Sequence, residues 1–325
     1  MISRREMVRS LLAASAGAVV SGLPAATQTG GEARASQSRG SGYDFESVRK
    51  RILDAVAQGQ ATGVAVAVAQ HGRIIWEEGF GWANRQEGRK VTAHTPFSLA
   101  SITKPFTTTT LMTLVAEGKI ALDDPANKYL SKSKLVGPNG NPDGATVRLL
   151  GAHAGGLPSM FERYFEDDGT QAPTAEALLR DYGRLAYPPG CCYEYSNVGF
   201  VALGAMASNV TGSDFGTLMT RRLLQPLGMN DSFFGTNAER LRVSAVRYDD
   251  SGKPIPYYTT STPPSGELYA SAHDLARFAM FNLKDHLQDQ SRILDDHWID
   301  ELHKPVFSGP AGTASACGWF TGNTK

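Results

Sequence analysis

The spacing of hydrophobic residues predicts a helix and a β-hairpin at the start of the folded part of the chain. Residues 44–58 carry apolar side chains at helical spacing on a charged background, the pattern of an amphipathic helix. Residues 63–69 form an unbroken apolar run suited to a buried strand. His71-Gly72 then marks a tight turn, and residues 73–80 return the chain. We therefore expect an antiparallel hairpin after the helix.

The pattern downstream is mostly helical. A largely uncharged helix is predicted to begin close to Ser101 and to end at Gly118, because glycine commonly follows the last helical turn. A second, apolar helix is predicted over 196–210, and Gly212 ends it. The run from Ser271 to Asp274 has the form of a capping box at the start of another helix. Clear strands are scarce after the hairpin, so we expect one domain of two lobes.

Ser101-Ile-Thr-Lys104 is the first candidate for chemistry. A serine and a lysine three residues apart share one face of a helical turn. A serine at a helix start also faces the positive end of the helix dipole, which favours developing negative charge. Lys104 can take the serine proton or stabilise the alkoxide, so this pair predicts an activated nucleophile. Pro105 supports the placement, since proline is tolerated only in a first helical turn.

Ser-x-x-Lys is a weak signal by itself, because the chain contains two further copies. Ser47/Lys50 lies in the charged amphipathic helix, and Ser131/Lys134 lies in the polar run SKSK. Both are expected to be solvated surface. Only Ser101 is preceded by an extended stretch and followed by a largely uncharged helix.

Tyr195-Ser-Asn197 is the second candidate. A phenol is an unusual base because its ordinary pKa is about 10. A lysine ammonium about 4 Å away contributes roughly 4 kcal/mol at an effective dielectric constant of about 20, which would lower the pKa of Tyr195. A Ser–Lys–Tyr group is therefore electrostatically workable. Read alone, however, the motif favours Tyr195 as a core tyrosine and Asn197 as a helix cap.

From about Gly63 to Trp319 the chain resembles the serine β-lactamase and penicillin-binding-protein superfamily, in particular its class C-related branch. The matching segments occur in the family's order, at 97–130, 146–158, 187–212, 223–234 and 265–278. The resemblance implies an α+β fold, with an antiparallel sheet flanked by helices plus an all-helical subdomain. It also implies that Ser101 is acylated, that Lys104 and Tyr195 transfer protons, and that Asn197 orients the lysine and the substrate amide.

One element of the family's pattern has no counterpart here. It is a Lys- or His-x-Gly on an edge strand, which lines the cleft and supplies a second oxyanion-hole N–H. His153-Ala-Gly155 is not a substitute, because it belongs to the end of a predicted helix. C-terminal strands are thus expected to be missing, and the domain over 36–325 to be C-terminally incomplete. Such a chain is expected to be poorly active and prone to aggregate.

Composition restricts the partners. The chain has 41% hydrophobic and 20% charged residues with zero formal net charge, so nucleic acid is not implied as a partner. Its seven histidines show no local metal-ligand spacing, and we predict neither a metal nor a cofactor. The expected partner is a small-molecule or peptide substrate. The sequence leaves the oligomeric state open.

The first residues predict export. Arg4-Arg5 resembles the start of a twin-arginine signal, residues 11–23 form a short apolar region, and Ala33-Arg-Ala35 has the form of a cleavage site. We predict a signal peptide over 1–35, a mature domain over 36–325, a periplasmic or secreted location and no membrane segment in the mature form. An uncleaved anchor is the alternative.

Two functions compete on this evidence. The first is an exported serine hydrolase that forms an acyl-enzyme on an amide, β-lactam or ester carbonyl, with a lean towards a broad esterase or peptidase. The alternative is a catalytically incomplete binder of cell-wall peptide or penicillin, favoured by the absent Lys- or His-x-Gly.

Overall fold

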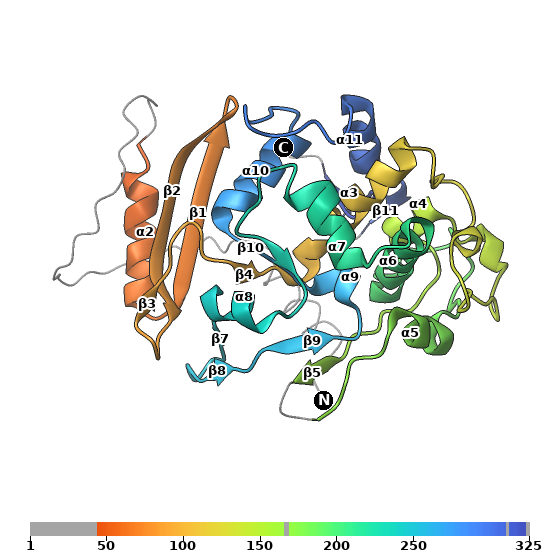
Figure 1. Cartoon of the computed structure of the whole chain (residues 1–325), viewed down its shortest axis with the longest axis horizontal. Coiled ribbons are helices and arrows are strands. Elements are labelled where there is room, and N and C mark those ends of the chain that lie inside the picture. Colours follow the sequence, from red (N-terminus) through yellow and green to blue (C-terminus); the bar gives the residue numbers. More distant parts are fainter. Residues whose placement is uncertain (1–43, 166–168, 310–311, 323–325) are drawn as a thin grey trace. The chain divides into compact units, whose positions relative to one another are not determined.

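The predicted hairpin is present in the computed structural model, which describes residues 44–165, 169–309 and 312–322 (Figure 1). Strand β1 (Gly63–Gln70) pairs antiparallel with β2 (Arg73–Asn84), and β3 (Arg89–Lys90) extends the sheet beyond β2. His71 and Gly72 have φ values of 51° and 65°. Positive φ at both positions suits a two-residue turn that follows the twist of the strands. The hairpin prediction is confirmed.

The predicted signal peptide, residues 1–35, lies outside the described residues. Within the ranges that the structure describes, no helix is both long and apolar enough to cross a bilayer.

Helices cover both faces of the hairpin. Figure 1 shows α2 (Glu46–Ala57) on one side and α10 (Ala272–Asn282) on the other. Phe45, just before α2, stacks on Trp76 of β2 with ring centroids 4.8 Å apart. Helix α10 packs against both β1 and β2. The apolar run of β1 is therefore explained by a sheet that has a helix on each side.

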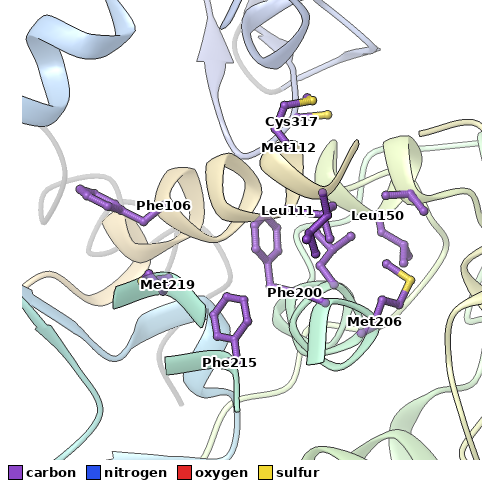
Figure 2. Close-up of a cluster of buried hydrophobic side chains, with 14 of the residues drawn as sticks. Phe106, Leu111, Met112, Leu150, Phe200, Met206, Phe215, Met219 and Cys317 are labelled. Atoms are coloured by element: carbon purple, nitrogen blue, oxygen red, sulfur yellow. The ribbon is translucent and has the colours of Figure 1, made fainter. Parts of the chain in front are cut away.

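The helical lobe is built around α3 (Thr103–Ala116) and α6 (Asn197–Thr211). Every residue of α3 from Thr103 to Val115 is buried except Pro105. Figure 2 shows its side chains packing with residues of α6 and with Cys317 from the end of the chain. A helix buried on all sides has no polar stripe, which is why Lys104 is the single charged residue of α3.

The buried threonine hydroxyls of α3 are hydrogen-bonded. Thr109 and Thr110 donate to carbonyls of their own helix, at Pro105 and Phe106. Thr107 donates to the carbonyl of Pro264 at 2.6 Å. Thr108 donates to the carbonyl of Cys317 at 2.9 Å. Each buried hydroxyl thus has a partner, and two of these hydrogen bonds join α3 to other segments.

The predicted helix ends agree with the structure. Gly118 has a φ of 70° directly after α3, and the N–H of Lys119 donates to the carbonyl of Leu114, as in a Schellman cap. Gly212 has a φ of 67° after α6. Ser271 accepts from the backbone N–H of Asp274 at the start of α10. The remaining α-helices in the described residues are α4 (Val147–Gly151), α5 (Ala175–Tyr182), α7 (Phe215–Met219), α8 (Ala238–Val243), α9 (Pro263–Gly266) and α11 (Asp296–His303).

Short strands that the sequence pattern did not predict form small antiparallel sheets between the helices. The order β4-β10-β6 makes one sheet, β5 pairs with β9, β7 pairs with β8, and β11-β12-β13 makes another sheet near the C-terminus. Their bounds are β4 Phe97–Ser98, β5 Arg163–Phe165, β6 Phe233–Phe234, β7 Arg247–Tyr248, β8 Pro254–Ile255, β9 Tyr258–Thr260, β10 Leu268–Ala270, β11 Phe307–Ser308, β12 Ala314–Ser315 and β13 Phe320–Thr321. Strands of two or three residues are too short to show a period. The fold is α+β, as predicted, and among the described residues only β2 pairs with β1.

Candidate active site

Ser101 lies where strand β4 passes into helix α3. A short 3₁₀ turn, η1 (Ala100–Ile102), precedes the helix, and Pro105 falls in the first turn of α3. Ala100 has a φ of 46°, a left-handed conformation that is unfavourable for a residue with a Cβ. Strain of this kind is often found where a reactive side chain is presented. The Ser101 side chain is exposed, whereas Lys104, one turn later, is buried.

Three oxygen atoms surround the Lys104 amine. Nζ lies 3.2 Å from Oγ of Ser101, 2.8 Å from Oδ1 of Asn197 and 3.1 Å from the carbonyl oxygen of Ser265. The carbonyl and amide oxygens can only accept hydrogen bonds. A neutral amine has two N–H bonds for these two acceptors, which leaves its lone pair for the hydroxyl of Ser101.

Burial favours that neutral form. It lowers the pKa of Lys104 from 10.5 to about 7, because desolvation penalises the ammonium. Near neutral pH a large fraction of Lys104 is then an unprotonated amine beside the serine hydroxyl, and such an amine can act as a base.

Tyr195 is also at the site, but its ionisation differs from the sequence-based expectation. Its side chain is hydrogen-bonded to Ser101, and burial, the larger effect, raises the pKa of the phenol. Nζ of Lys104 lies 4.7 Å from the centroid of the Tyr195 ring. The expected lowering of the pKa required a charged lysine, and the same burial that affects the phenol also favours the neutral amine. Tyr195 is therefore a protonated phenol at neutral pH.

Asn197 is held in a fixed orientation. It is the first residue of α6, and the preceding residue, Ser196, caps the helix by accepting from the N–H of Gly199 at 3.0 Å. The Asn197 side chain donates from Nδ2 to the carbonyl of Met160 at 3.2 Å. That bond turns Oδ1 towards Lys104. The helix cap is thus Ser196, and Asn197 is a buried partner of the lysine.

Two groups at the site were missed by the sequence analysis. The first is the main-chain carbonyl of Ser265 in α9, which no side-chain pattern can reveal. The second is His153, whose ring stacks on Tyr195 with centroids 4.3 Å apart and accepts from the N–H of Ser196 through Nδ1 at 3.1 Å. Burial, with a smaller effect from Lys104, lowers the pKa of His153 to about 3. His153 is a neutral support for the tyrosine ring.

The structure brings together four residues: Ser101 in η1, Lys104 in α3, Tyr195 just before α6, and Asn197 at its first position. The other two Ser-x-x-Lys copies have different partners. Ser47 is exposed on α2, where Lys50 pairs with Asp54 at 2.7 Å. Lys134 donates to the main chain, including the carbonyl of Asn127 at 2.7 Å. Of the three copies, the one at Ser101 is therefore the one that lies beside Tyr195 and Asn197.

The fold and this constellation define a class of protein. The beta-lactamase family model matches residues 48–325, and the chain belongs to that family. Protein flp of Staphylococcus aureus (strain MRSA252) is 28% identical over 280 residues, which are 82% of this chain and 54% of flp. Esterase EstB of Burkholderia gladioli is 31% identical over 220 residues, 62% of this chain and 54% of EstB.

Solved structures agree with this assignment. The D-alanine carboxypeptidase AmpC of Burkholderia cenocepacia superposes with a TM-score of 0.68 at 26% identity, covering 85% of this chain and 73% of AmpC. The chain spans about half the length of the curated relatives it matches, 54% of flp and of EstB.

Proposed function

We propose that this chain is a serine hydrolase in which Ser101 forms an acyl-enzyme on an ester or amide carbonyl. The observation that carries the proposal is the environment of Lys104. Asn197 and Ser265 occupy the two N–H bonds of its neutral amine, and the remaining lone pair lies 3.2 Å from the serine oxygen. A pKa of about 7 for Lys104 supplies the unprotonated form near neutral pH.

Acylation then proceeds in a defined order. Lys104 takes the proton of Ser101 as Oγ attacks the carbonyl carbon, and the carbonyl oxygen becomes an oxyanion. When the tetrahedral intermediate collapses, the bond to the leaving group breaks. The leaving group receives the proton from Lys104 through the Tyr195 hydroxyl, which passes on one proton as it accepts another. Water releases the acyl group by the same steps in reverse.

Esters and D-amino-acid peptides are the substrate classes we favour over β-lactams. One relative is named an esterase and one structural neighbour a D-alanine carboxypeptidase. We also propose that the protein works outside the cytoplasm, in the periplasm or as a secreted protein. Support for this comes from Arg4-Arg5 and the apolar segment 11–23 that follows.

Labelling with a fluorescent fluorophosphonate tests the nucleophile. The full chain should label, and Ser101→Ala should not. Ser47→Ala is a matched control, because it removes the serine of another Ser-x-x-Lys at an exposed position of α2. Its labelling should equal that of the unmodified protein. Labelling of Ser101→Ala at the full rate would refute the proposal.

Turnover is measured with p-nitrophenyl esters, D-Ala-D-Ala peptides and a chromogenic cephalosporin. Release of product from an ester or a D-amino-acid peptide, abolished by Ser101→Ala, is the expected result. Stable labelling without turnover of any of these substrates would instead favour the binder of cell-wall peptide or penicillin.

A further inference from the structure

A cluster of potential metal ligands lies apart from the residues of the candidate active site. Glu77, His94 and His273 each offer one ligand atom, and these atoms lie within 4.8 Å of one another. Oε1 of Glu77 is 3.7 Å from Nε2 of His94, and Oε2 is 2.8 Å from Nδ1 of His273. Around a tetrahedral zinc ion, ligand atoms are about 3.3 Å apart, given bond lengths of about 2.0–2.2 Å. The cluster is thus close to a coordinating geometry.

A further carboxylate completes the arrangement expected around a zinc ligand. Nδ1 of His94 lies 2.7 Å from Oδ2 of Asp231. That contact occupies one ring nitrogen and leaves Nε2, the nitrogen that faces Glu77, free of its proton. Metal-binding histidines usually have such a partner, which fixes the tautomer and the ring orientation. Asp231 is itself positioned by its backbone N–H, which donates to Asp274 at 2.9 Å.

The three ligands come from separate elements that are already fixed to one another. Glu77 is on β2, His94 lies in the turn before β4, and His273 is in the first turn of α10. The backbone N–H of His273 donates to the carbonyl of Ala93 at 3.1 Å, and the two imidazole rings are 4.6 Å apart. The scaffold therefore keeps the ligands close without a metal. Binding an ion would replace the hydrogen bond between Nδ1 of His273 and Oε2 of Glu77 with bonds from both atoms to the metal.

Charge and access also suit a divalent cation. Glu77 and Asp231 bring two carboxylates to the cluster, and the histidines can bind as neutral ligands. The side chain of His94 is 52% exposed and that of Glu77 31% exposed, so an ion can reach the cluster from solvent. A cavity of about 310 Å³ adjoins it, lined in part by His94 and Asp231 and also by the cationic side chains Arg89, Lys90 and Arg240.

We propose that Glu77, His94 and His273 form a zinc site, with water as the fourth ligand and Asp231 orienting His94. Two histidines and a carboxylate are a ligand set that zinc takes in proteins. No local sequence motif predicts this site, because its ligands are far apart along the chain. The prediction of no metal rested on local spacing alone and could not have found it.

The site's place in the fold gives it a structural role. The segment from His94 to Ser101 and the segment from Ser265 to His273 run antiparallel and meet at the pairing of β4 with β10. At one end of this pair, Lys104 bonds the carbonyl of Ser265. At the other end, zinc would join His94 to His273. The ion therefore holds together the two segments that form part of the catalytic arrangement, and it takes no part in the reaction.

The first test measures zinc binding by the full, tag-free chain. Equilibrium dialysis followed by metal analysis should give one Zn²⁺ per chain, and the melting temperature should rise with zinc concentration. Asp231→Asn keeps the ligands and should weaken binding by about 10- to 100-fold. His94→Ala removes a ligand and should weaken it more. His297→Ala, at an exposed histidine of α11, is the matched control and should bind as the unmodified protein does.

The second test identifies the ligands spectroscopically. Co²⁺ in place of zinc should give the visible absorption of a tetrahedral site with nitrogen and oxygen ligands. A strong sulfur-to-cobalt charge-transfer band would mean that the adjacent cysteines Cys191 and Cys192 bind the ion, and would overturn the proposal. Zinc affinity unchanged in His94→Ala, or no bound zinc in protein that circular dichroism shows to be folded, would overturn it as well. Glu77→Gln, which keeps side-chain size, repeats the test if His94→Ala does not fold.

Discussion

Lys104 and Asn197 are direct partners although 93 positions separate them in the sequence: Nζ of the lysine lies 2.8 Å from Oδ1 of the asparagine. The amide is neutral, so it accepts a hydrogen bond without stabilising a positive charge as a carboxylate would. The low pKa of Lys104, about 7, depends on this neutrality as well as on burial.

Asn197→Asp should therefore raise the pKa of Lys104. A carboxylate of the same shape beside the amine favours the ammonium, typically by one pKa unit or more. The acid limb of the pH–rate profile, which we expect near pH 7 for the unmodified protein, should move to higher pH by about one to three units. Rates of ester hydrolysis between pH 5 and 10 provide the measurement. A limb that stays in place would show that another group titrates.

Tyr195→Phe separates two proton-transfer schemes. Because burial raises the pKa of Tyr195, the phenol stays protonated and the base is Lys104. We expect the acid limb to remain near pH 7, with a rate lowered by up to about 10²-fold through loss of the proton relay. The rate of single-turnover acylation, measured from pH 5 to 10, distinguishes Lys104 from a tyrosinate as the base. Loss of the limb itself would point to a tyrosinate base.

Lys104 should also make stability depend on pH. Its pKa is about 7 in the folded protein and 10.5 ordinarily, so between these values the unfolded chain binds a proton that the folded chain does not. The free energy of unfolding then rises with pH across this window, by up to about 1.4 kcal/mol per pH unit. Below pH 7 the full cost of burying the ammonium is present.

Lys104→Met removes this group and serves as the reference. The difference in unfolding free energy between the unmodified protein and Lys104→Met, measured by urea denaturation, should increase from pH 7 to pH 10. A difference that is flat over this range would contradict the lowered pKa.

Gly318 packs so closely against helix α3 that a side chain has no room there. Its φ is 76°, and a Cβ there would lie 2.5 Å from Oγ1 of Thr108 and 3.0 Å from the carbonyl oxygen of Lys104. Gly318→Ala should cost about 2–4 kcal/mol, from backbone strain and overpacking together. Gly312 has a φ of 77° with nothing within 4 Å, so Gly312→Ala should cost about 1 kcal/mol. Equal losses in urea denaturation would mean that the contact with α3 is unimportant.

The sequence predicted the elements whose signals are local. The hairpin turn at His71-Gly72 and the glycine after α3 require particular backbone conformations, and these restrict the residue type. The pairing of Ser101 with Lys104 follows from helical spacing alone. Such features depend on neighbours within a few residues, which a pattern can capture.

Other features depend on distant parts of the chain. The direction of the Tyr195 pKa is set by how deeply α6 and its neighbours bury the ring, and a pairwise estimate with a charged lysine gave the opposite sign. The Ser265 carbonyl belongs to the main chain, where residue type carries no information. Strands β4 and β10 form because they pair with each other, although they are far apart in the sequence. Ser98 pairs with Tyr269, 171 positions later (269 − 98).

The threonine hydroxyls of α3 have a consequence for how this protein can change. Thr107 and Thr108 hydrogen-bond helix α3, which follows Ser101 and carries Lys104, to the carbonyls of Pro264 and Cys317. Replacing either threonine by valine would leave a buried carbonyl without its hydrogen bond close to Lys104. Substitutions in α3 should therefore be poorly tolerated, and we expect substitutions that adapt the protein to a new substrate to occur in the exposed loops around it. In a directed-evolution experiment, we expect gains in activity to accumulate in segments such as 187–191, while residues 103–115 stay as they are.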